Sequence, residues 1–138
     1  MKYLLDTNIC IFYLRGKLDL ESIFEEKGRK NCFISEITVL ELIVGAENSD
    51  IPSNSNKAIE KFIKNFTIIP ITNVIKLFAK EKIRLKKIGK PIHDNFDILI
   101  GVTAIENKLI LVTDNTKDFM RLEGIKIENW YSRKTNGK

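Results

Sequence analysis

The chain has 138 residues, which is the size of one ordinary domain and enough to bury a hydrophobic core. Its 23 basic residues outnumber its 18 acidic ones, and the net charge of +5 favours a polyanionic partner. No apolar run approaches the roughly 20 residues that span a bilayer, and the isolated Cys10 and Cys32 exclude a disulfide framework. We expect one cytoplasmic domain over residues 1–138, without a signal peptide and with a flexible basic tail from about residue 131.

Short apolar runs alternate with segments of helical periodicity along the whole chain. In chain order we predict strand 3–5, helix 8–14, helix 20–27, strand 32–34, helix 37–46, helix 59–66, strand 67–71, helix 72–88, helix 96–107, strand 109–112, a short helix from 116, and strand 125–127. Strands that alternate with helices predict a mainly parallel sheet with helices on both faces, which is a three-layer α/β/α architecture.

Capping and turn residues mark several element ends. Ser35 and Asp94 are placed to cap the helices that follow them, and either Thr7 or Asn8 is placed to cap the first helix. The polar stretch at residues 47–56 predicts the one clear surface loop.

Three acidic residues lie in segments that are otherwise typical of a buried core. Asp6 ends the first predicted strand, Glu41 lies inside an apolar helical segment, and Asp97 precedes a run of isoleucine and leucine. None of these segments contains a lysine or arginine. Because an ionised carboxylate in an apolar setting either shifts its pKa or finds a cation, the pattern indicates a metal site.

These acids are expected to meet at one edge of the sheet. Functional groups of a parallel sheet gather at the carboxyl ends of the strands, where Asp6 and Asp114 both fall. Glu41 and Asp97 would reach that edge from helices on which small or polar residues share their face. A site of carboxylates without histidine or thiolate favours Mg²⁺ or Mn²⁺ over Zn²⁺, and such an ion suits hydrolysis of a phosphodiester.

Each acid also has an ordinary structural interpretation. Asp6 and Asp97 could stabilise helix N-termini, and Asp114 could serve a turn. Glu41 could face solvent from the edge of its helix. The combination of the four acids is what favours a common site.

The acids lie within a series of short motifs that extends over nearly the whole chain. These are LLDTN at residues 4–8, ISEIT at 34–38, ELIVGA at 41–46, DILIG at 97–101, VTDN at 112–115, DF at 118–119, GI at 124–125 and NW at 129–130. In this order and at these intervals they resemble the PIN-domain toxins of the VapC type, the ribonuclease half of bacterial and archaeal toxin–antitoxin pairs.

The resemblance implies a PIN-like fold and an endoribonuclease whose active-site acids Asp6, Glu41 and Asp97 hold Mg²⁺ or Mn²⁺. The fourth catalytic and metal-binding acid is expected to be Asp114, with Asp118 as an alternative or as a ligand through water. The resemblance further implies an RNA substrate cut with metal-activated water, a cognate antitoxin whose C-terminal segment enters the acidic groove, a homodimer, and a toxin–antitoxin hetero-oligomer.

The segment from residue 76 to residue 90 is rich in basic side chains, with Glu81 as its one acid. It is the best candidate for contacts with RNA phosphates, and a solvated helix face is the equally weighted alternative. The predicted RNA-binding residues are Lys80, Lys82, Arg84, Lys86, Lys87 and Lys90.

Two other functions compete with the ribonuclease hypothesis. One is a nuclease of the same fold that acts on DNA or on structured nucleic acid, although such enzymes usually carry helices for which this short chain has little room. The other is a non-catalytic module that binds RNA or a protein partner, against which the presence of all the acids argues.

Overall fold

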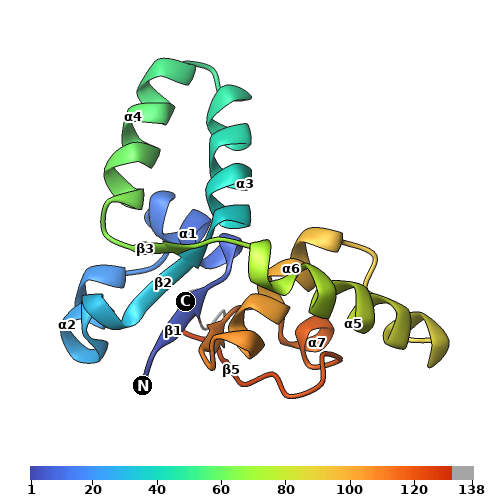
Figure 1. The fold of residues 1–138 in the computed structure, drawn as a ribbon. Coiled ribbons are helices and arrows are strands. Elements are labelled where there is room, and N and C mark those ends of the chain that lie inside the picture. Colours follow the sequence, from blue (N-terminus) through green and yellow to red (C-terminus); the bar gives the residue numbers. More distant parts are fainter. Residues whose placement is uncertain (132–138) are drawn as a thin grey trace.

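The computed structural model describes residues 1–131, which form a five-stranded sheet in the order β3-β2-β1-β4-β5 (Figure 1). Every pair of neighbouring strands is parallel, and Tyr3 of the central strand lies between Cys32 and Ile110. The strands are β1 Tyr3–Leu5, β2 Cys32–Ser35, β3 Thr67–Ile69, β4 Ile110–Val112 and β5 Ile127–Glu128. The central strand therefore ends beside the ends of β2 and β4.

Helices connect the strands, as the alternation in the sequence predicts. They are α1 Thr7–Leu14, α2 Leu20–Lys27, α3 Glu36–Glu47, α4 Pro52–Ile63, α5 Ile75–Lys87, α6 Asn95–Glu106 and α7 Thr116–Phe119, with 3-10 turns at Arg29–Asn31 and Thr72–Val74. None of the helices in residues 1–131 is long and apolar enough to cross a membrane.

The period-2 alternation of β1 divides the core into two layers. Tyr3 and Leu5 belong to a cluster that includes apolar side chains of α1, α2 and α4, whereas Leu4 belongs to a cluster formed mainly by α5, α6 and the segment around Phe119. Helices thus cover both faces of the sheet, and the predicted three-layer α/β/α architecture is confirmed.

Some local predictions were wrong, each for a physical reason. The stretch 47–56 is not all loop, because Pro52 occupies the first turn of α4, where its missing N–H costs nothing. The first helix is capped by the side chain of Asp6 instead of Thr7 or Asn8. The last strand pairs at Ile127–Glu128, later than predicted. Most of the predicted basic tail, residues 132–138, lies outside the described residues.

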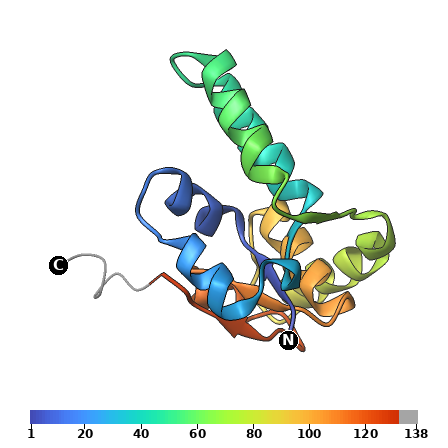
Figure 2. The same ribbon diagram turned by 90° about the vertical axis from the view of Figure 1, so that its left-hand side faces the viewer.

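The α3–α4 hairpin projects from the body of the molecule (Figure 2). Because it projects, apolar residues of α3 are more exposed than the sequence suggests: Leu40 is 43 % exposed and Val44 is 60 % exposed. Glu41 between them is half-buried, so its setting is less apolar than the sequence pattern indicates.

Glycine at position 101 lets α6 approach the segment after α7. A Cβ added at Gly101 would lie 2.1 Å from Cδ1 of Leu122 and 3.4 Å from Cδ1 of Phe119, and both of these side chains are buried. Gly45 in α3 offers a contrast, since a Cβ there would meet no atom within 4 Å.

We predict opposite effects of alanine at these two helical glycines. Gly101→Ala should lower the free energy of unfolding by about 1–3 kcal/mol, because the clash outweighs the gain in helix propensity. Gly45→Ala should raise it by about 0.5–1 kcal/mol through helix propensity alone. Urea denaturation monitored by circular dichroism measures both, and equal stability of the two variants would contradict the close packing described at Gly101.

Candidate active site

Asp6 lies at the carboxyl end of the central strand and is only 3 % exposed. Its backbone N–H donates to the carbonyl of Val112 at 2.9 Å, which extends the β1–β4 pairing to the acid itself. One carboxylate oxygen accepts from the N–H of Thr7 at 2.8 Å, and the other accepts from the hydroxyl of Thr113 at 2.9 Å. The acid is therefore fixed between the start of α1 and the end of β4.

Glu41 reaches the same edge from α3 through two threonines. The hydroxyl of Thr7 donates to Oε1 of Glu41 at 2.7 Å and lies 2.9 Å from the hydroxyl of Thr38. A hydroxyl has one proton to donate, so Thr38 donates to Thr7 when Glu41 accepts from it. Thr38 and Glu41 share one face of α3, as their spacing predicts.

Asp97 lies in the first turn of α6, whose N-cap is Asp94. The N–H of Phe96 donates to Oδ1 of Asp94 at 2.9 Å, so the predicted cap is confirmed. Asp97 is half-buried. Burial is the main cause that raises its pKa to about 7, and nearby negative charges add to the rise: Asp6, Asp94, Glu41 and Asp118.

The pKa values of the other two acids, Asp6 and Glu41, are raised as well. Burial raises the pKa of Asp6 to about 6, although the hydrogen bonds from Thr113 and Thr7 lower it. The charges of Glu41 and Asp94 raise it further. Burial and the charge of Asp94 also raise the pKa of Glu41, against the lowering effect of Thr7. The acids thus act on one another, and in residues 1–131 none of Asp6, Glu41 and Asp97 forms an ion pair with a lysine or arginine.

Asp94 is the residue whose influence on the site the sequence interpretation missed. Its charge raises the pKa of Asp6, Glu41 and Asp97, although its side chain also caps α6. The signal was its spacing of three residues before Asp97, which places both carboxylates near the same helix end.

The two candidates for the fourth acid lie in different surroundings. Asp114 follows Thr113 directly after β4 and accepts from Nδ2 of Asn129 at 3.0 Å. Asp118 in α7 accepts from Nδ2 of Asn115 at 3.3 Å and lies 3.7 Å from Nη2 of Arg121. Asp118 is also among the charges that raise the pKa of Asp97. The fourth position stays a prediction, with Asp114 as the first choice and Asp118, whose charge acts on Asp97, as the alternative or the ligand through water.

The carboxylates match Mg²⁺ or Mn²⁺ in chemical type but are not arranged around an ion. Within the described residues, no group of three or more Asp, Glu, His or Cys side chains is positioned to hold a metal ion. The side chains would have to turn toward a common point to bind one. The observation in favour of a cation is electrostatic, because the pKa of each of three acids is raised where carboxylates crowd together.

A groove of about 270 Å³ begins beside Glu41 and runs between α1, α3 and α4. Its walls are mostly apolar, and it is lined by Ile11, Leu14, Arg15, Glu41, Leu42, Gly45, Ala46, Ser55 and Ile59. The acidic edge is therefore continuous with an apolar surface.

The predicted RNA-binding residues lie on or just after α5, which packs against α6, the helix that carries Asp97. Five of these six residues are exposed, and Arg84 is half-buried; the five are Lys80, Lys82, Lys86, Lys87 and Lys90. The structure does not test their contact with RNA, which stays a prediction. His93 is exposed in the loop before α6, and Phe12, Tyr13 and Trp130 pack against the core.

Comparison with known proteins agrees with this description. The family model for the PIN domain matches residues 3–125. Ribonuclease VapC2 of Haemophilus influenzae is 39% identical over 132 residues, 94% of this chain and 98% of the relative. The tRNA(fMet)-specific endonuclease VapC of Shigella flexneri is 34% identical over the same shares of the two chains.

Solved structures give the same result for the fold. The crystal structure of DNA-bound VapBC from Salmonella typhimurium contains a chain that superposes on this one with a TM-score of 0.87. That chain is 32% identical, and the match covers 94% of this chain and 98% of the other. The protein therefore belongs to the PIN-domain family.

Proposed function

We propose that the protein is a metal-dependent endoribonuclease and the toxin of a toxin–antitoxin pair. The observation that carries the proposal is the group of Asp6, Glu41 and Asp97, whose pKa values are raised by burial and by like charges at the edge of the sheet. Similarity over nearly the whole chain to proteins named as ribonucleases and as a tRNA endonuclease supports it.

Asp6, Glu41 and Asp97 are the residues that we propose to hold Mg²⁺ or Mn²⁺, with Asp118 or Asp114 as a fourth ligand, either directly or through water. A bound ion supplies a water of lowered pKa and balances charge on the phosphoryl oxygens. The oxygen-only set of side chains supports the choice of ion, because Zn²⁺ more commonly takes histidine or cysteine ligands.

Hydrogen bonds from the chain itself orient two of these acids. The N–H of Thr7 and the hydroxyl of Thr113 each occupy one oxygen of Asp6, and the hydroxyl of Thr7 occupies one oxygen of Glu41. Such hydrogen-bond partners commonly orient ligand carboxylates in metal sites. We propose in-line attack of water on an RNA phosphodiester, without a covalent enzyme intermediate.

A groove of this chain supports the antitoxin partner that the sequence resemblance implies. The groove between α1, α3 and α4 offers apolar walls and has one acid, Glu41, and one base, Arg15, in its lining. A mainly apolar segment would fit it, with a basic side chain placed beside Glu41. Binding there would cover Glu41 and block the acids. We also propose a homodimer, which the exposed apolar residues Leu40, Ile43 and Val44 of α3 support.

We predict that Asp6→Asn, Glu41→Gln and Asp97→Asn each slow RNA cleavage by at least about 100-fold, because each removes a charged ligand. The assay is single-turnover cleavage with Mg²⁺ or Mn²⁺, and initiator tRNA is the first RNA to test, since one relative is named tRNA(fMet)-specific. Asp50→Asn, in the exposed turn before α4, is the matched control and should cleave like wild type.

Two outcomes of this assay contradict the proposed function. One is a folded wild-type protein that cleaves no RNA with either metal. The other is cleavage that persists unchanged in all three acid variants, which would place the reaction elsewhere. Thermal unfolding of each variant shows whether a loss of activity reflects a loss of folding.

The fourth acid is tested by comparing Asp118→Asn with Asp114→Asn. We predict that Asp118→Asn slows cleavage by about 10–100-fold if Asp118 is a ligand or a ligand through water. The reason is the coupling of Asp118 to Asp97. A loss of this size in Asp114→Asn, with a near wild-type rate in Asp118→Asn, would assign the fourth position to Asp114.

The raised pKa values predict how stability depends on pH without metal. Because Asp97 has a pKa near 7 in the folded state and about 4 when unfolded, the folded state binds protons more tightly, and stability falls as pH rises through this window. At about pH 8 and without metal, Asp97→Asn should therefore be more stable than wild type by about 1–2 kcal/mol, a figure reduced because Asp97 is only half-buried. Near pH 4 the difference should vanish.

Added Mg²⁺ or Mn²⁺ should reverse that order at pH 8. A ligand that binds the folded state raises its stability, so the wild-type melting temperature should rise with metal concentration while that of Asp97→Asn should hardly move. Chelator titration followed by thermal unfolding measures this without any activity assay. Equal responses of wild type and Asp97→Asn would contradict metal binding at this site.

A further inference from the structure

The basic side chains of α5 have different structural roles, and Arg84 serves the fold. Its guanidinium donates to both oxygens of Glu81, at 2.8 and 2.9 Å, and to the carbonyl of Arg121 at 2.8 Å. Glu81 is buried and also accepts from the N–H of Glu123 at 3.2 Å. This cluster ties α5 to the segment after α7, and the charge of Arg84 is already neutralised by Glu81.

Lys82, on another side of α5, contacts the first residue of α6. Its ammonium donates to Oδ1 of Asn95, the first residue of α6, and lies 5.8 Å from the centre of the Phe78 ring. Lys82 therefore joins α5 to the start of the helix that carries Asp97.

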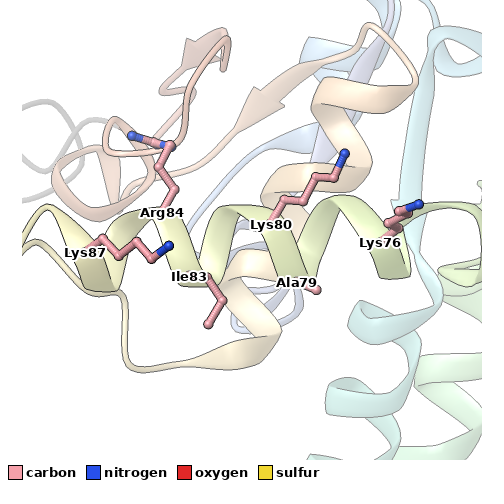
Figure 3. A pocket seen from close by; sticks show the side chains of 6 residues that line it. All are labelled: Lys76, Ala79, Lys80, Ile83, Arg84 and Lys87. Atoms are coloured by element: carbon pink, nitrogen blue, oxygen red, sulfur yellow. The ribbon is translucent and has the colours of Figure 1, made fainter.

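The outer face of α5 carries three other lysines. Lys76, Lys80 and Lys87 follow one another at spacings of four and seven residues, which places them along one side of the helix (Figure 3). All three are exposed, and in residues 1–131 none of them forms an ion pair. With Ala79, Ile83 and Arg84 they line an open hollow of about 600 Å³ that contains no acidic side chain. We call Lys76, Lys80 and Lys87 the outer lysine row.

A polyanion that approaches the acids needs such a row. Asp6, Glu41, Asp94, Asp97 and Asp118 together repel phosphates, so attraction must come from cations on a neighbouring surface. α5 packs against α6, so the outer lysine row lies on the helix next to the one that carries Asp97. A strand with one phosphate at the acids could therefore continue over α5.

We propose that the outer lysine row is a second RNA-contact site, which holds the phosphate backbone of the single strand that flanks the cut. This inference rests on the proposed function and adds a requirement for flanking nucleotides. Three exposed ammonium groups beside Ala79 and Ile83, with no aromatic ring among the lining residues, suit phosphates and not bases. Contact is independent of base sequence, and a second copy of the same lysine face is disfavoured by repulsion.

The test is the salt dependence of RNA binding in chelator, where no cleavage occurs. The probe is a labelled single-stranded RNA oligonucleotide, and the variant is Lys76→Gln/Lys80→Gln/Lys87→Gln. Each phosphate contact to a single strand contributes about −0.7 to the slope of log affinity against log salt, so the slope should become shallower by about 2. Lys57→Gln/Lys61→Gln/Lys64→Gln, at exposed positions on α4 and at its C-cap, removes the same charge and is the control.

Cleavage kinetics separate this inference from the proposed function. With a substrate that has long flanks, the outer-row variant should raise KM, and its effect should fall on KM more than on kcat. Shortening the flanks should raise the wild-type KM toward that of the variant. Wild-type protein that cleaves no RNA with metal contradicts the proposed function itself.

Three results would overturn the outer lysine row while leaving the ribonuclease in place. In the first, the two triple variants change the salt slope equally, so that only net charge matters. In the second, the outer-row variant keeps the wild-type slope and KM. In the third, the outer-row variant keeps both but escapes inhibition by the antitoxin, which would assign the row to an acidic protein segment. Arg84→Gln should act differently, because it breaks the hydrogen bonds to Glu81 and therefore lowers thermal stability.

Discussion

The rest of the site depends on the burial of one carboxylate at the end of the central strand. Asp6 is 3 % exposed and is held by the N–H of Thr7 and the hydroxyl of Thr113. Because β1 lies between β2 and β4, the segments that leave all three strands start close to Asp6. One of them becomes α1, and another becomes α3, whose Thr38 and Glu41 meet the hydroxyl of Thr7. The order of the strands thus decides which side chains surround the acid.

This arrangement costs stability in the absence of a cation. Burial raises the pKa of Asp6 and of Asp97, and each carboxylate near them adds to the effect. A group of like charges that destabilises a fold is common where charge is used for binding or catalysis. The Glu81–Arg84 pair shows the opposite case, because a buried acid with an arginine partner has a lowered pKa and joins two parts of the fold.

Sequence patterns predicted the features that depend on neighbours along the chain. Strand Tyr3–Leu5, the caps Ser35 and Asp94, and the face shared by Thr38 and Glu41 follow from local periodicity and capping chemistry.

What the sequence could not supply depends on contacts between distant segments. The influence of Asp94 on Asp6, the pairing of Arg84 with the carbonyl of Arg121, and the effect of Asp118 on the pKa of Asp97 all need the tertiary fold.

The central claim is that the acids share a metal ion, and diffraction from crystals grown with Mn²⁺ tests it most directly. A shared ion would give an anomalous peak between Asp6, Glu41 and Asp97. No peak there, at a Mn²⁺ concentration that supports RNA cleavage, would contradict it.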